Sequence, residues 1–169
     1  MLLATYSLWA RDIIRFYRQR SRVIGALGTP VVFWLLLGSG LGSSFRVNAD
    51  ASVNYLQYFF PGTLALIVLF TAIFSTISVI EDRREGFLQG VLVAPVPRAT
   101  IVVGKLLSGT TLAVLQAMLF LLLAPATGID LRADLILPLV VALLTLAFAL
   151  TGLGFLVAWQ LDSTQGFHA

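Results

Sequence analysis

The sequence predicts an all-α, polytopic membrane protein, with an N-terminal amphipathic interfacial helix followed by four transmembrane helices. Apolar residues make up 59% of its 169 residues and charged residues only 11%, whereas soluble domains are about 45–50% apolar and about 25% charged. The mean hydropathy is +0.96. Four nearly uncharged stretches also reach the length that crosses a bilayer. Because so apolar a chain cannot cover its surface with polar groups in water, we expect a membrane as its solvent.

Composition excludes several classes of function. The chain has no cysteine and one histidine, His168, so it predicts no disulfide, thiolate nucleophile, histidine pair or other metal site. The spans hold no paired carboxylates, and we therefore expect a protein that is not an enzyme. The net charge is +3, but the basic residues are spread among apolar runs. They form no stripe that could follow phosphates, so no nucleic-acid partner is predicted.

We interpret the chain as a single membrane domain with four spans, at residues 23–43, 59–80, 101–124 and 135–159. At 1.5 Å per residue, about 20 helical residues cover the ~30 Å hydrocarbon core. Small residues close the first span, and Gly38 and Gly42 lie one helical turn apart. Their spacing indicates close helix packing rather than a nucleotide-binding fingerprint.

The placement of Lys and Arg predicts the orientation. Nine of the eleven basic residues precede the first span, lie in the 81–98 loop or stand at Lys105, and the opposite loops hold only Arg46 and Arg132. Basic residues concentrate on the cytoplasmic side, so we expect a cytoplasmic N-terminus and a cytoplasmic 81–98 loop, in a cell inner membrane. A cleaved signal peptide is the alternative, but the basic segment is too long for it.

The segment 4–22 has the pattern of an amphipathic helix. Its aromatic and apolar residues and its arginines each recur at intervals of three and four, namely Tyr6, Trp9, Ile13 and Phe16 on one face and Arg11, Arg15, Arg18 and Arg22 on another. Such a helix suits the lipid headgroup layer. It could serve as an anchor that fixes topology, or as a mechanical element that contacts a cytoplasmic partner.

The 81–98 loop opens with five consecutive charged residues, Glu81-Asp82-Arg83-Arg84-Glu85. A short helix should follow and end before Pro95 and Pro97, because proline disfavours helix at the preceding residue. Its apolar face would hold Phe87, Leu88, Val91 and Leu92, while Gly86 and Gly90 would let another chain approach. The loop is either a solvated stop signal for the second span or a helix that receives a partner.

This loop is one of several motifs that together resemble the permease subunit of ATP-binding-cassette (ABC) type-2 exporters. The others are the Arg11–Arg22 helix, Pro30-Val-Val-Phe-Trp34, Asn54-Tyr-Leu-Gln-Tyr-Phe-Phe-Pro-Gly62 and Gly104-Lys105. The resemblance covers essentially the whole chain. Family members usually have six spans, so it implies a partial permease that lacks the last two. It also implies multidrug efflux or export of lipids or polysaccharide precursors.

In that family the loop between the second and third spans is a coupling helix, seated in a cleft of a separate ATPase subunit. The resemblance therefore implies an ATPase contact set of Glu81, Asp82, Arg83, Arg84, Glu85, Gly86 and Phe87, with coupling support from Lys105, Arg15 and Arg18. ATP and Mg²⁺ would be bound by the ATPase, and this chain, which has no phosphate loop, would hold no cofactor. A second permease copy or a homologue would complete the transporter.

Some alternatives stay open at this point. Lys105, the only charge inside a span, could snorkel to the headgroups or bond the coupling loop, for instance at Glu85. The hydroxyl stripe of Thr71, Ser75 and Ser78 could serve helix packing or a substrate path. The rival functions are an ATPase-independent secondary transporter or channel-like protein, and a membrane scaffold that transports nothing.

Overall fold

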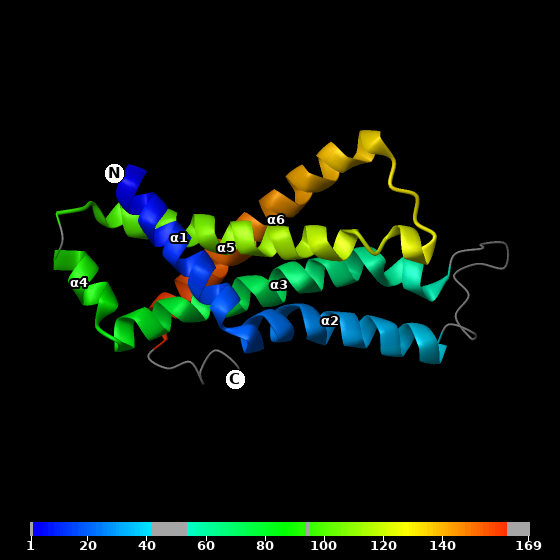
Figure 1. Cartoon of the computed structure of the whole chain (residues 1–169), viewed down its shortest axis with the longest axis horizontal. Helices are drawn as coiled ribbons and strands as arrows, with labels where there is room; N and C mark the ends of the chain where they lie inside the picture. Colours follow the sequence, from blue (N-terminus) through cyan, green and yellow to red (C-terminus); the bar gives the residue numbers. More distant parts are fainter. Residues whose placement is uncertain (1, 42–53, 94, 162–169) are drawn as a thin grey trace.

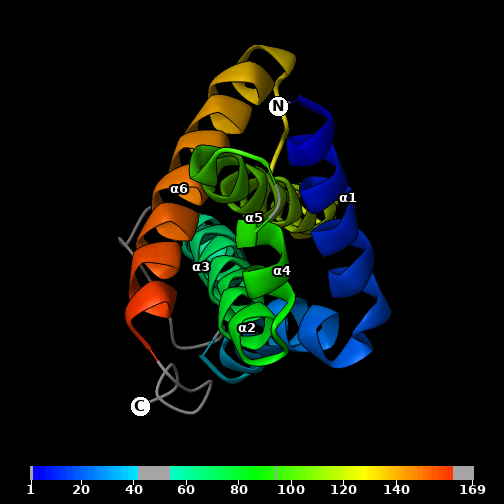
Figure 2. The same ribbon diagram turned by 90° about the vertical axis from the view of Figure 1, so that its left-hand side faces the viewer.

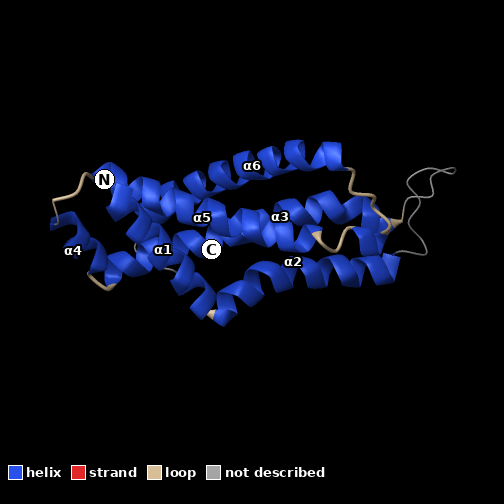
Figure 3. Cartoon of the chain, turned by 45° about the horizontal axis from the view of Figure 1, so that its top comes forward, coloured by secondary structure: helices blue, strands red, loops and turns tan. Residues whose placement is uncertain are grey.

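The computed structural model describes residues 2–41, 54–93 and 95–161. Within these ranges the chain forms helices and no strands, which confirms the all-α class (Figure 3). The helices are α1 (Leu2–Arg18), α2 (Arg20–Leu41), α3 (Tyr55–Arg84), α4 (Phe87–Val93), α5 (Arg98–Leu121) and α6 (Ala133–Gln160), with a 3₁₀ turn, η1 (Pro125–Thr127), between the last two.

Four of these helices, α2, α3, α5 and α6, are long and apolar enough to cross a membrane, as predicted. They run lengthwise through the molecule, while α1 and α4 lie toward the end where α3 finishes and α5 begins (Figure 1). Helix α3 extends to Arg84. The first charges of the predicted loop therefore form the last turn of a spanning helix.

The interior is built around α3, which packs against α2, α5 and α6. At the end away from α4, three aromatic rings fill the space between α2, α3 and α5. Phe60 stacks on Phe120 with ring centroids 4.7 Å apart, and Trp34 meets both rings edge-on. The indole N–H of Trp34 donates to the carbonyl of Leu56 at 3.0 Å. Aromatic pairs of this geometry add ~0.5–1.5 kcal/mol beyond their burial.

Helices α3, α5 and α6 approach closely through small and hydroxyl residues. A Cβ on Gly109 of α5 would lie 2.5 Å from Cγ2 of Thr151 and 2.8 Å from Oγ of Ser75. The Thr71 hydroxyl lies 2.7 Å from Oε1 of Gln116, also on α5. These contacts favour the packing interpretation of the hydroxyl stripe. Of the predicted glycine pair, Gly38 lies against Leu56, whereas its predicted partner at position 42 is outside the described residues.

Helix α6 is attached to the bundle by a narrow strip of its surface. Its buried residues recur every three or four positions and are Leu143, Ala147, Thr151, Phe155 and Ala158. The N-terminal half of α6 diverges from α5 (Figure 1). The rest of its surface is apolar and exposed within this chain, which suits contact with lipid or with another membrane helix.

Candidate functional site

The candidate site lies at the end of the bundle where α1 and α4 meet the spans (Figure 2). Helix α4 follows a turn at Gly86, whose φ of +75° is accessible to glycine without strain. Leu88 is buried against Leu8 of α1 and Ile101 of α5, and Phe87 and Val91 pack beside it. Helix α4 therefore rests on α1 and α5 through the apolar face that the sequence predicts.

The opposite side of α4 is open. Gln89 and Gly90 are exposed, and a Cβ on Gly90 would meet no atom within 4 Å. Leu92, which we expected on the packed face, is 44% exposed, and Val93 is 87% exposed. Two bare aliphatic side chains beside an unobstructed glycine leave room for another polypeptide.

The first three charged residues before α4, Glu81, Asp82 and Arg83, contact other helices, whereas Arg84 and Glu85 are exposed. Asp82 has no exposed surface and accepts charge-assisted hydrogen bonds from three cationic side chains. The donors are Nη2 of Arg11 at 2.7 Å, Nη1 of Arg15 at 2.6 Å and Nζ of Lys105 at 2.5 Å. Asp82 thereby joins α3 to both α1 and α5.

Glu81 and Glu85 are the other two carboxylates of the charged run before α4. Glu81 accepts a hydrogen bond from Arg15 at 3.0 Å and another from Arg22, at the start of α2. Glu85 pairs with Arg15 at 3.1 Å, but its side chain is 59% exposed. Arg15 thus contacts all three carboxylates of this run, Glu81, Asp82 and Glu85. Arg18 is exposed and makes no ion pair within the described residues.

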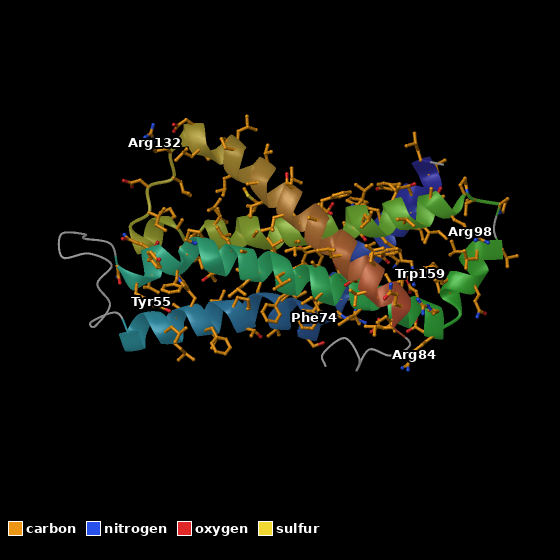
Figure 4. All side chains as sticks on the ribbon, turned by 180° about the vertical axis from the view of Figure 1, so that it is seen from behind. Tyr55, Phe74, Arg84, Arg98, Arg132 and Trp159 are labelled. Atoms are coloured by element: carbon orange, nitrogen blue, oxygen red, sulfur yellow. The ribbon has the colours of Figure 1, made fainter. Side chains whose placement is uncertain are left out.

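Arg83 points to a different helix. Its guanidinium donates to the backbone carbonyls of Trp159 and Leu161 at the end of α6, the latter at 3.4 Å. It also lies 5.2 Å from the centre of the Trp159 ring. The last carbonyls of a helix carry partial negative charge, so a cation is favoured there. Figure 4 shows Trp159 at the same end as Arg84 and Arg98, opposite Tyr55 and Arg132.

Lys105 is buried within the protein and pairs with Asp82 of the predicted 81–98 loop, so the structure favours the loop contact over snorkelling, although the partner is not Glu85. Its ammonium lies 2.5 Å from Asp82 and 2.8 Å from Asp12 of α1. The hydroxyl of Ser108 is 3.3 Å from the same Asp12 carboxylate. Sequence reasoning missed Asp12, although it is the only acidic residue among the arginines of this segment, and that isolation was the available signal.

Arg11 connects the ion pairs to α4. Its guanidinium carbon lies 3.6 Å from the centre of the Phe87 ring, a cation–π contact. Hydrogen bonding to Asp82 raises the pKa of Arg11 above its ordinary value, while burial opposes the shift. Arg11 therefore stays charged, and it holds the first residue of α4 against the bundle.

The described residues hold no group of three or more acidic, histidine or cysteine side chains arranged to bind a metal ion. The contacts described at this end of the bundle are ion pairs, hydrogen bonds and apolar packing. Its charges are balanced locally, with four carboxylates facing four cations, and the partners come from α1, α2, α3 and α5.

Four spanning helices, with a peripheral helix held beneath them by buried ion pairs, define a polytopic membrane protein. Residues 4–167 match the ABC-2 type transporter family, and the chain belongs to this family. The match confirms the resemblance inferred from the motifs.

Two curated relatives are similar over most of the chain. A transport permease of Cyanophora paradoxa, ycf38, is 29% identical over 128 residues, which cover 75% of this chain and 44% of the relative. Nodulation protein J of Rhizobium leguminosarum bv. viciae is 27% identical over 124 residues, which cover 67% and 47%. The chain thus spans less than half the length of these relatives. No solved structure matches it.

Proposed function

We propose that this chain is the permease subunit of an ATP-driven ABC exporter of the inner membrane, with its N-terminus in the cytoplasm. In this proposal α4 is the coupling helix, and a separate ATPase subunit binds ATP and Mg²⁺. The observation that carries it is the two-sided character of α4. One side is anchored on Leu8 and Ile101, and the other is open.

The structure narrows the surface that we propose for the ATPase. Within the predicted contact set, Asp82 is buried and the Glu81 and Arg83 side chains are engaged by other helices. The exposed members are Arg84 and Glu85. We propose that these two act together with the open face of α4, which consists of Gln89, Gly90, Leu92 and Val93.

A partner seated on this surface would push on a helix that cannot slide independently. The apolar contacts of Leu88 and the cation–π contact of Phe87 fix α4 to α1 and α5. Movement of the ATPase would therefore pass into the spans. Export of a drug, a lipid or a polysaccharide-type molecule would follow from this movement. In the alternative function, a secondary transporter, an ion gradient would drive transport without an ATPase.

A second permease copy or a homologue is the other proposed partner. Helices α2 and α6 expose large apolar side chains along their length, among them Phe33, Leu36, Phe148 and Leu156. In a complete transporter, part of this surface would contact the second permease and the rest would contact lipid.

The test is co-purification of the tagged chain with its ATPase, identified by mass spectrometry and by ATP hydrolysis. We expect Leu92→Glu with Val93→Glu to lower the amount of bound ATPase at least tenfold, because two carboxylates would enter an apolar contact. The control Leu131→Glu makes the same kind of change at the opposite end of the bundle and should retain the ATPase. Equal retention by both variants, or transport that continues without any ATPase, would overturn the proposal.

A further inference from the structure

We infer that Glu81, Asp82 and Arg83, which lie in the last turn of α3, are positioning residues that connect α4 to every spanning helix. Each of the three holds a different neighbour, so a displacement of this turn displaces the other spans in concert. The inference rests on the proposed function only in naming an ATPase as the source of the displacement.

Helix geometry explains why three consecutive residues can do this. Successive residues of an α-helix point about 100° apart. Glu81 faces the start of α2 through Arg22, Asp82 faces α5 through Lys105, and Arg83 faces the end of α6. One turn of α3 therefore contacts all the other spans, and α1 joins it through Arg11 and Arg15.

The contacts made by Glu81, Asp82 and Arg83 should resist displacement, because they involve buried charges and backbone acceptors. Asp82 and Lys105 are both buried, so water does not replace either partner when the helices are strained. Removing one partner of such a pair leaves an unpaired charge in a low-dielectric environment, which is strongly destabilising. Arg83 donates hydrogen bonds to backbone carbonyls rather than to a side chain, so its position is tied to the backbone of α6.

The turn is also closely connected to α4. Only Glu85 and Gly86 separate α3 from α4. The ring of Phe87 and the side chain of Leu88 contact Arg11 and Leu8 of α1, the same helix that holds Asp82. Helix α1 is therefore attached both to α4 and to the end of α3, so the three segments should move together. Glu81, Asp82 and Arg83 would transmit this movement to the other spanning helices.

The absence of cysteine from the chain allows a direct test with pairs of spin labels at introduced cysteines. Ala99→Cys in α5 provides a common reference, paired with Gln160→Cys in α6 or with Ser21→Cys in α2, all three at exposed positions. Pulsed electron paramagnetic resonance then gives the two distance distributions in lipid nanodiscs.

For the chain alone, we expect Arg83→Met to broaden the α5–α6 distribution and leave α5–α2 unchanged, and Glu81→Gln to do the reverse. Asp82→Asn should broaden both distance distributions, because it weakens the contact with Lys105 of α5, the helix that carries the reference label. The control Arg18→Met removes an exposed arginine and should change neither. Unchanged distributions in all three variants, or equal broadening by Arg83→Met and Glu81→Gln, would overturn the inference.

In the complex with the ATPase, a coupling role predicts an effect that a purely structural role does not. Arg83→Met should abolish the ATP-dependent change in the α5–α6 distance, keep the change in α5–α2, and leave the thermal midpoint within about 3 °C of the parent. Arg83→Lys should restore part of the α6 response, and a full response in Arg83→Met would refute the coupling role. If no ATPase binds, the proposed function fails, while the measurements on the chain alone still decide the inference.

Discussion

Nζ of Lys105 lies 2.5 Å from Oδ2 of Asp82, and both side chains are shielded from solvent. Helix α1 covers this pair and adds the carboxylate of Asp12 at 2.8 Å from the ammonium. A charge in an apolar helix is costly when lipid surrounds it. Here protein surrounds it, because the buried face of α1, with Leu8, Asp12 and Phe16, packs onto the bundle.

Replacing Lys105 should destabilise the fold strongly. Lys105→Met removes the buried cation from between Asp12 and Asp82, which then share only Arg11. Loss of one partner of a buried ion pair costs ~3–5 kcal/mol. We expect about 3 kcal/mol, at the lower end, because Asp82 keeps Arg11 and Arg15. Thermal unfolding in detergent, followed by circular dichroism, measures the loss.

The matched control for this substitution is Lys105→Met combined with Asp12→Asn. It removes one charge of each sign, and apolar or neutral replacement of a whole buried pair is often tolerated. The double variant should recover at least half of the lost stability. A midpoint no higher than that of Lys105→Met would show that the Asp12–Lys105 pair is not the source of the effect.

Two glycine-to-alanine variants distinguish the effect of close helix packing on stability from the effect of helix propensity. Gly109→Ala places a Cβ 2.5 Å from Thr151 and 2.8 Å from Ser75, and overpacking of this kind costs ~1–3 kcal/mol. Gly62→Ala, in the interior of α3, meets nothing within 4 Å and should stabilise the helix by ~0.5–1 kcal/mol. Thermal midpoints that shift in the same direction for both variants would contradict this account.

The turn before α4 should require glycine. Gly86 has φ +75°, and a left-handed conformation costs a residue with a side chain ~1–2 kcal/mol. Gly86→Ala should therefore destabilise α4 and weaken ATPase binding. Gly90→Ala, with open space around it, should leave the stability of α4 equal or higher. Hydrogen exchange over residues 87–93 reports α4 directly, and equal protection in the two variants would argue against a strained turn.

The orientation can be tested by labelling intact cells with an impermeant maleimide. Val93→Cys and Asp130→Cys introduce exposed thiols at opposite ends of the bundle, in a chain that has no others. We expect labelling of the cysteine at 130 from outside, and of the cysteine at 93 only after the cells are opened. The reverse pattern would invert the proposed topology.

The class of protein, the four spans and the short apolar-faced helix after Gly86 could all be predicted from the amino-acid sequence. These features follow from hydropathy and from local periodicity, which each segment carries regardless of its neighbours. The directions in which Glu81, Asp82, Arg83 and Lys105 point could not be predicted in this way, because they depend on how the helices pack. Their partners lie far away in the sequence, such as Arg11 for Asp82 or Leu161 for Arg83, and only the packing of the helices brings such groups within hydrogen-bonding distance.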